Sequence, residues 1–568
     1  MKITAGVLIL CTVTGLSAHA ETSVPMQLCF GGGDHPTTGD VERKIEAERE
    51  FVKYLQRGKA TSHETYVRWS MIEPAKGTFD FKFQDAILAV DQAAGLKWVP
   101  FIVLSPAYTL PDWFYHGPED VGYVCLEHGK RSDIQTLWNP HLRPHIKRAY
   151  AAFGKHYAKN KSLESVLLGV SGNYGETLVP ASNLDWTQDL HGPYHTHVGW
   201  WVGDDYAVAD FRKRAIQEYK TVKALNRAWG TTFSKETDIR TQLPPQWPTT
   251  AARQFQAEWM LDSMTEYADF CMKTAKAALP KTDVYLVVGG HAPSYHGLDI
   301  TAQTEAAAKR DCGIRITNEA DPFQLNFPIT RMVSSACRFY GTFFSYEPAG
   351  AISYKGVATR SFNATASGAK CLHWYENNVR ETTRALEVWD RCRPLMRQRE
   401  PVIDVAVFYP RRWMNLQGDE ELVYMYQDFG AVRAATDYDF LDERLLNTFS
   451  SGKLKPYKYL LVREDTVADE ISSRAVTRFL RRKDAPKGIF FMRGQPQAPD
   501  AHGWLQGIAK TVHPNDDYTS GIYHARFTDG SLLFLSELDV EADLSKTHPQ
   551  MVKNTTVLRP REMLEVRE

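Results

Sequence analysis

The sequence carries almost no net charge. Lys and Arg total 67, Asp and Glu total 68, and the formal net charge is -1 over 568 residues. No basic run interrupts this balance, so the sequence offers no field that would attract nucleic acid or an anionic membrane. It also lacks a phosphate-binding loop, because the glycines at 31–33 are not followed by a Lys-Ser/Thr pair. We therefore expect neither nucleic acid nor a nucleotide cofactor as a ligand.

Cysteines are few, and none stands in a pair. Beyond the N-terminal segment there are seven, Cys29, Cys125, Cys271, Cys312, Cys337, Cys371 and Cys392. An odd number excludes complete pairing within one chain. None belongs to a CxxC pair or to a Cys/His cluster with zinc spacing. The sequence therefore predicts mostly buried thiols, with at most one disulfide expected, and it predicts no metal.

Long apolar runs are absent except at the N-terminus. Lys2 precedes an apolar stretch at 3–16, and Ala18 and Ala20 then form a small-x-small cleavage pattern. This predicts a signal peptide at 1–20 and a mature chain that begins at Glu21. No other stretch reaches the ~18 apolar residues that a membrane span needs. We expect an exported protein, periplasmic or extracellular, with no membrane segment.

Short apolar runs recur along the first two thirds of the chain, and each ends in small or polar residues. We predict strands at 26–30, 98–104, 166–170, 284–289, 314–317, 338–345 and 371–374, and a second strand that ends near residues 66–69. Helical patterns separate them. Eight strands alternating with helices predict a (β/α)8 TIM barrel, an α/β fold, over residues 21–398.

Two further regions follow the barrel. Apolar runs at 403–408, 459–462 and 488–492 alternate with helical patterns, which predicts a small doubly wound domain over 399–512. It has no GxGxxG motif, so we assign it no nucleotide. Residues 513–568 include an alternating polar and apolar stretch at 523–538, which predicts a small C-terminal β region.

Two carboxylates follow predicted barrel strands. The strand at 166–170 breaks into Ser-Gly-Asn-Tyr-Gly and then presents Glu176, and the seventh strand is followed by Glu347. The loops at the carboxyl ends of barrel strands share one rim. Two carboxyl groups on that rim are what hydrolysis of a glycosidic bond requires. If this pair is wrong, Glu73 and Glu319 are the carboxylates that could replace it.

Aromatic residues are frequent, with 14 Trp and 26 Tyr, and their rings can stack on the apolar faces of sugars. Each such residue could equally belong to the core. Near the expected strand ends we select as candidate substrate-binding residues Arg68, Trp69, Asn173, Tyr174, His195, His197, Trp200, His291, Asn318, Trp374 and Glu376. An ion pair, a turn or internal packing is the structural alternative for each.

Several segments resemble one known family. Residues 68–81, RWSMIEPAKGTFDF, resemble the second-strand signature of the family 42 β-galactosidases, and 224–231 and 344–350 are similar to later segments of that family. The second domain is similar to the family's flavodoxin-like trimerisation domain. The resemblance implies an exo-acting, retaining hydrolase of a β-linked sugar, with Glu176 as acid, Glu347 as nucleophile, an oligosaccharide or polysaccharide substrate, and a homo-oligomer, a trimer.

One loop departs from that family. Family 42 enzymes place the acid directly after an Asn, but here Asn173 is followed by Tyr174. The string at 172–180, GNYGETLVP, is instead similar to the acid loop of family 14, the inverting β-amylases. Two alternatives therefore stay open: an inverting hydrolase of an α-glucan, and a barrel that binds carbohydrate without catalysis.

Overall fold

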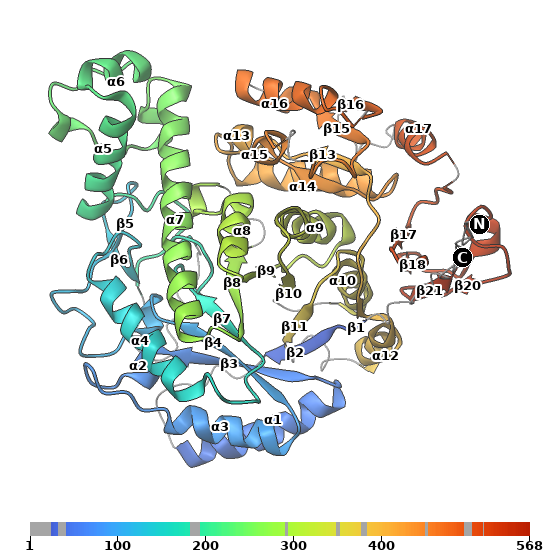
Figure 1. Ribbon diagram of the computed structural model, residues 1–568, viewed down its shortest axis with the longest axis horizontal. Helices are drawn as coiled ribbons and strands as arrows, with labels where there is room; N and C mark the ends of the chain where they lie inside the picture. Colours follow the sequence, from blue (N-terminus) through green and yellow to red (C-terminus); the bar gives the residue numbers. More distant parts are fainter. Residues whose placement is uncertain are drawn as a thin grey trace, which may run out of the picture.

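The computed structural model describes residues 24–31, 41–181, 194–289, 294–347, 353–375, 383–448, 452–467, 469–484, 486–492, 502–514 and 516–567. The predicted signal peptide, His291 and Glu376 lie outside these ranges. Among the helices within them, none combines the length and apolar character that crossing a bilayer demands. Figure 1 shows the barrel strands, the helices around them, a second sheet beside α9, and a small β region near the C-terminus.

The predicted barrel is confirmed. Eight parallel strands close on themselves in the order β10-β11-β2-β3-β4-β7-β8-β9. Their bounds are β2 Gln27–Gly31, β3 Ser62–Arg68, β4 Lys97–Val103, β7 Ser165–Gly169, β8 Asp283–Gly289, β9 Gly313–Thr317, β10 Phe344–Glu347 and β11 Cys371–Tyr375. A short pair, β1 Val24–Pro25 with β12 Arg397–Gln398, joins the two ends of this region.

Helices surround the barrel: α1 Val41–Arg57, α2 Trp69–Ile72, α3 Lys82–Ala93, α4 Leu142–Tyr157, α5 Asp205–Tyr219, α6 Val222–Trp229, α7 Thr250–Ala278, α8 Ile300–Lys309, α9 Phe323–Tyr340, α10 Tyr354–Ala366 and α12 Thr383–Cys392. One strand prediction was wrong at its start, because residues 338–340 are the last residues of α9. That helix ends where Gly341 takes φ 74°, a left-handed conformation that glycine adopts without strain.

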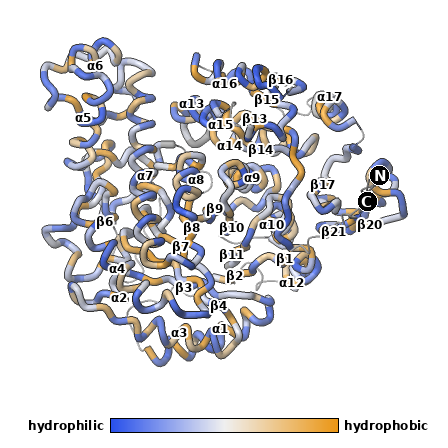
Figure 2. The backbone as a smooth tube through the Cα atoms, viewed as in Figure 1, coloured by the Kyte–Doolittle hydropathy of each residue, from blue (hydrophilic) through white to orange (hydrophobic). Residues whose placement is uncertain are grey.

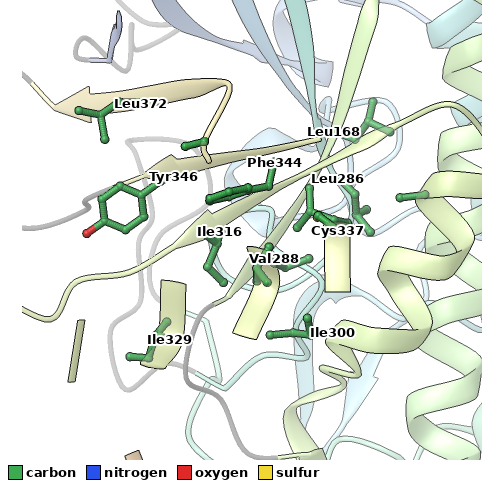
Figure 3. Packing of buried hydrophobic residues seen from close by; sticks show 14 of the residues in the cluster. Leu168, Leu286, Val288, Ile300, Ile316, Ile329, Cys337, Phe344, Tyr346 and Leu372 are labelled. Carbon is green, nitrogen blue, oxygen red and sulfur yellow. The ribbon is translucent and has the colours of Figure 1, made fainter. Parts of the chain in front are cut away.

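The two faces of each strand serve different purposes. Leu168, Leu286, Ile316 and Leu372 point outward and pack beneath the helices (Figure 3), whereas alternate residues such as Leu167 fill the barrel interior. The outer helices carry both hydrophilic and hydrophobic residues along their length (Figure 2), as helices with one buried face do. This alternation decides which side chains reach the rim and the interior.

A four-stranded parallel sheet follows the barrel, in the order β14-β13-β15-β16. Its strands are β13 Val405–Phe408, β14 Asp439–Leu441, β15 Tyr459–Arg463 and β16 Gly488–Met492. Its helices are α13 Arg411–Met414, α14 Asp419–Arg433, α15 Glu443–Leu446, α16 Glu470–Leu480 and α17 His502–Val512. The strand order is the doubly wound, flavodoxin-like one. Asp439 anchors this sheet to the barrel, because it forms ion pairs with Arg331 and Arg338 of α9.

The C-terminal region is a small antiparallel sheet. Its three strands are β17 Ile522–Arg526, β18 Ser531–Ser536 and β21 Met563–Arg567, with a short pair β19 Ala542–Asp543 and β20 Val557–Leu558 beside them. The predicted alternation at 523–538 corresponds to the β17–β18 hairpin. All seven predicted thiols lie in the described ranges, where all are buried and none forms a disulfide.

Candidate active site

Glu176 lies in a tightly held loop after β7. Gly175 takes φ 116°, and a Cβ there would lie 2.8 Å from the ring of Phe101, so the loop passes too close to β4 for a side chain. Thr177 donates its backbone N–H to the carbonyl of Val287, at 3.0 Å, and its hydroxyl to Gln303, at 2.9 Å. These contacts fix the backbone on both sides of the Glu176 side chain.

Glu347 is the last residue of β10 and is only 3% exposed. It stands in register with Thr317, the last residue of the neighbouring strand β9. The Thr317 hydroxyl donates to Glu347 Oε2 at 2.7 Å, and Arg315 Nη2 lies 2.6 Å from Glu347 Oε1. Both carboxylate oxygens therefore have a defined partner, and the side chain is oriented before any ligand binds.

The two predicted carboxylates share one hydroxyl group. Besides its bond to Glu347, Thr317 Oγ1 lies 3.5 Å from Glu176 Oε1. The two contacted oxygens, one on each carboxylate, are therefore at most about 6.2 Å apart, a separation at which two carboxyl groups can act on one glycosidic bond. The structure thus brings the pair together as predicted.

The two carboxylates differ in their electrostatic surroundings. Burial and the negative charge of Glu347 raise the pKa of Glu176 to about 7. The Oε2 atom of Glu176 is buried and has no hydrogen-bond partner in the described part of the chain. Glu347 instead lies against the Arg315 guanidinium. The arrangement therefore offers a proton donor beside an ion-paired carboxylate, the division of roles that paired catalytic carboxyls need.

A third carboxylate lies deeper in the barrel. Glu64 of β3 is 2% exposed, and its Oε1 lies 3.4 Å from the same Arg315 Nη2 that contacts Glu347. Burial raises the pKa of Glu64, although Arg315 opposes the shift. The sequence patterns did not point to Glu64, Arg315 or Thr317. The alternation of side chains along β9 could have identified two of them, because it turns both Arg315 and Thr317 toward the barrel interior.

Two of the predicted binding residues belong to the loop of Glu176, and a third lies at the end of β3. Arg68 is fully buried at the end of β3, with its guanidinium 5.1 Å from the centre of the Tyr108 ring. Tyr174 is partly buried within the Glu176 loop. Asn173 Nδ2 donates to the Thr196 hydroxyl at 2.9 Å, and this contact ties the loop to the segment 194–201.

Other predicted residues serve the framework. Trp374 is fully buried on the outer face of β11, with its ring 5.0 Å from that of Trp389, so it is no stacking platform. Trp69 is buried and donates its indole N–H to Glu73. The amide of Asn318 is buried and bonded to the carbonyl of Asn326 and to Thr330. Successive side chains of a strand point to opposite faces. Because His373 points into the barrel, its neighbour Trp374 points outward.

Neither substitute carboxylate replaces the pair. Glu73 is buried beneath the rim, where it accepts hydrogen bonds from Trp69, Gly77 and Arg148. Glu319 is exposed, and its charge is one of the smaller influences that raise the pKa of Glu176. The geometry therefore favours Glu176 and Glu347 over both alternatives.

The predicted substrate-binding residues His195 and His197 belong to a different cluster. Ligand atoms of Cys125, His128, His195 and His197 all lie within 4.8 Å of one another. Cys125 Sγ is 3.3 Å from His195 Nε2 and 3.6 Å from His128 Nδ1. One thiol and three imidazoles are a ligand set that suits zinc. The sequence prediction of no metal overlooked this set, because its Cys-x2-His and His-x-His halves are separated by more than sixty residues.

Comparisons with known proteins show which glycosidases this chain is similar to. The family model described as β-galactosidase of glycoside hydrolase family 42 matches residues 44–288. The chain resembles the family 42 β-galactosidases. The β-galactosidase bgaB of Geobacillus kaustophilus is 28% identical over 218 residues, which are 37% of this chain and 28% of the relative. The match thus spans less than a third of that relative.

Solved structures show that the likeness of fold extends beyond the segment matched by the family model. The β-galactosidase of Halorubrum lacusprofundi superposes with a TM-score of 0.69 at 13% identity, covering 96% of this chain and 99% of that one. The catalytic domain of a β-amylase from Paenibacillus polymyxa superposes with a TM-score of 0.56 at 16% identity, covering 66% of this chain and 99% of that one. The predicted resemblance to both families is confirmed.

Proposed function

We propose that this protein is an exo-acting, retaining glycoside hydrolase that cleaves a β-linked sugar with Glu176 and Glu347. The observation that carries the proposal is the single Thr317 hydroxyl, which lies 2.7 Å from Glu347 and 3.5 Å from Glu176. The resemblance to family 42 supports a β-galactoside as the substrate.

The proposed roles follow from the surroundings of each carboxylate. Glu176, with its pKa raised to about 7, is protonated in about half of the molecules at pH 7, and this proton goes to the leaving oxygen. Glu347, oriented by Arg315 and Thr317, attacks the anomeric carbon and forms a covalent glycosyl intermediate. Glu176 then takes a proton from water as that water releases the sugar.

Retention is the stereochemical part of the proposal. Retaining enzymes hold their carboxyl groups about 5–5.5 Å apart, whereas inverting enzymes leave about 6.5–9.5 Å for a water molecule. The limit of about 6.2 Å applies to one pair of oxygens and fits either class, so the choice of retention rests on the resemblance to family 42. NMR of the first-formed anomer tests this part directly. An inverted product would overturn retention and leave the two-carboxylate site intact.

Hydrolysis itself is tested with a β-galactoside that has a natural sugar leaving group and with an activated aryl β-galactoside. Glu347→Gln should abolish turnover of both. Glu176→Gln should abolish turnover of the natural substrate yet spare the aryl glycoside in part, because a good leaving group needs little protonation. Glu319→Gln is the matched control, since it removes an exposed rim carboxylate and should change neither rate more than about twofold. Equal losses in Glu176→Gln on both substrates would contradict the assignment of the acid.

The first alternative is an inverting, β-amylase-like hydrolase of an α-glucan. It is favoured by the loop at 172–180 and by partial similarity to the thermophilic β-amylase of Thermoanaerobacterium thermosulfurigenes, 23% identical over 195 residues. Release of disaccharide from maltopentaose without turnover of β-galactosides would select it. The second alternative, a non-catalytic carbohydrate-binding barrel, would show sugar binding without turnover of either substrate.

Export and assembly complete the proposal. The apolar N-terminal run and its small-x-small site support export of the mature chain. The flavodoxin-like sheet supports a homo-oligomer, which the family resemblance makes a trimer. N-terminal sequencing of the protein from its native host tests export, and light scattering at micromolar concentration tests assembly, where a pure monomer would contradict it.

A further inference from the structure

A separate cavity lies where α7 meets the segment that follows α13. Its volume is about 490 Å³. The lining residues that matter here are Glu127, Trp200, Trp247, Arg253, Tyr295 and Asn415. Arg253 belongs to α7, and Asn415 follows α13 of the second domain. Neither Glu176 nor Glu347 lines this cavity, whereas Trp200, one of the predicted substrate-binding residues, does.

One wall of the cavity is aromatic. The rings of Trp200 and Tyr295 are stacked, with centroids 5.3 Å apart and planes at 29°. Trp247 and the prolines at 244–245 continue the lining. Flat aromatic faces beside a few polar groups are typical of pockets for small organic ligands, and 490 Å³ lies within the usual size range of such pockets.

A buried amide without a hydrogen-bond partner belongs to a residue that lines both this cavity and a second, smaller one. Asn415 is 4% exposed, and both its Nδ2 and its Oδ1 are buried and unbonded within the described ranges. The Nε of Arg253 is likewise buried and unbonded there, whereas its Nη2 donates to the carbonyl of Leu416 at 3.1 Å. Leaving buried polar groups unpaired is costly, so a ligand that both donates and accepts hydrogen bonds would be stabilised here.

The lining charges indicate what kind of ligand would fit. Arg253 contributes one positive charge and Glu127 one negative charge, so the cavity has no excess of either sign. A Glu127 oxygen is already occupied by the backbone N–H of Trp200. An anionic group would therefore gain no net attraction, whereas hydroxyl groups can pair with the amide of Asn415.

We propose that this cavity binds an uncharged sugar unit, stacked on the Trp200–Tyr295 pair and hydrogen-bonded to Asn415. A sugar ring supplies both an apolar face and hydroxyl groups that donate and accept. The choice of a sugar rests on the proposed glycosidase function, and the cavity would give a saccharide a second anchor outside the catalytic centre. Binding here involves no bond cleavage, so it can be measured without turnover.

The test uses the full-length Glu347→Gln protein, which should not hydrolyse its ligands. β-1,4-Galactotriose and maltotriose are titrated separately and followed by calorimetry. Adding Asn415→Leu or Tyr295→Ala should raise the Kd of the saccharide that binds by about tenfold or more. Asn415→Leu removes two unpaired buried polar atoms at similar volume, so its Tm should not fall. Tyr206→Ala, an exposed tyrosine on α5 outside the cavity, is the matched control and should leave Kd unchanged.

The outcomes separate this inference from the proposed function. An unchanged Kd in both cavity variants would overturn the cavity as a sugar site, even if the wild-type protein hydrolyses galactosides. A raised Kd in both would support it, even if no substrate is turned over. Absence of binding by either trisaccharide to the parent protein would overturn it. Preferential binding of a sulfated galactotriose would overturn the proposal that the ligand is uncharged.

Discussion

Arg315 Nη2 lies 2.6 Å from Glu347 Oε1, and both side chains are almost completely buried. The same nitrogen lies 3.4 Å from Glu64 Oε1. One guanidinium group therefore serves two buried carboxylates, and the deeper of them, Glu64, has a raised pKa because burial disfavours its charged form. The site thus contains an acidic group that weakens folding once it ionises.

We predict that Glu64→Gln stabilises the protein at pH 8 and not at pH 4. The pKa of Glu64 is higher in the folded than in the unfolded state, so its contribution to stability is present below the unfolded pKa and is lost as pH rises through the folded pKa. Gln cannot ionise and can still accept from Arg315. Urea unfolding should show a gain on the order of 1–3 kcal/mol at pH 8. Glu319→Gln should show none, and an equal gain at both pH values would contradict the explanation.

The second prediction concerns the alkaline limb of activity. Because burial and Glu347 raise the pKa of Glu176 to about 7, its proton is lost above that pH, and kcat/KM for a natural-type substrate should fall about tenfold per pH unit. In Glu176→Gln, residual turnover of an aryl glycoside should lack this limb. A limb that persists unchanged in the variant would assign the titration to another group.

The barrel was predictable because its signal repeats. Each apolar run that ends in small polar residues marks a strand and its rim loop, and Glu176 and Glu347 follow two such runs. The start of β10 was not predictable in this way, since the apolar end of α9 continues the strand's composition and only Gly341 marks the boundary.

The supporting residues of the site were harder to predict. Trp374 and His373 are adjacent, and composition does not tell which of them faces inward. Register does, because Trp374 pairs with Phe30, whose side chain also packs in the outer core. Thr317 became informative only when its pairing with Glu347 was known. Contacts between distant segments are therefore what single-sequence patterns leave out.

The third prediction is that the protein holds about one zinc per chain at Cys125, His128, His195 and His197. Thr196, between two of these ligands, accepts the hydrogen bond from Asn173 in the acid loop. Loss of metal should therefore weaken the Asn173–Thr196 contact that holds the acid loop, and kcat/KM should fall several-fold.

Elemental analysis of protein purified without chelator measures the zinc content directly. Cys125→Ser and His195→Ala should each lose the metal, whereas His156→Ala, a histidine paired with Asp85 on another surface, should retain it. Metal-free wild-type protein after purification with added zinc would contradict the assignment.

The last prediction isolates the hydroxyl shared by the two carboxylates. Thr317→Val keeps the shape of the side chain but removes the donor 2.7 Å from Glu347 Oε2, so Glu347 keeps Arg315 and loses its second orienting contact. A charge-assisted hydrogen bond of this kind contributes about 1.5–3 kcal/mol, so kcat/KM should fall on the order of 10- to 100-fold while Tm changes little. Thr317→Ser restores the hydroxyl and should recover most of the loss. Equal activity of the Val and Ser variants would show that packing, rather than the hydroxyl, is what Thr317 contributes.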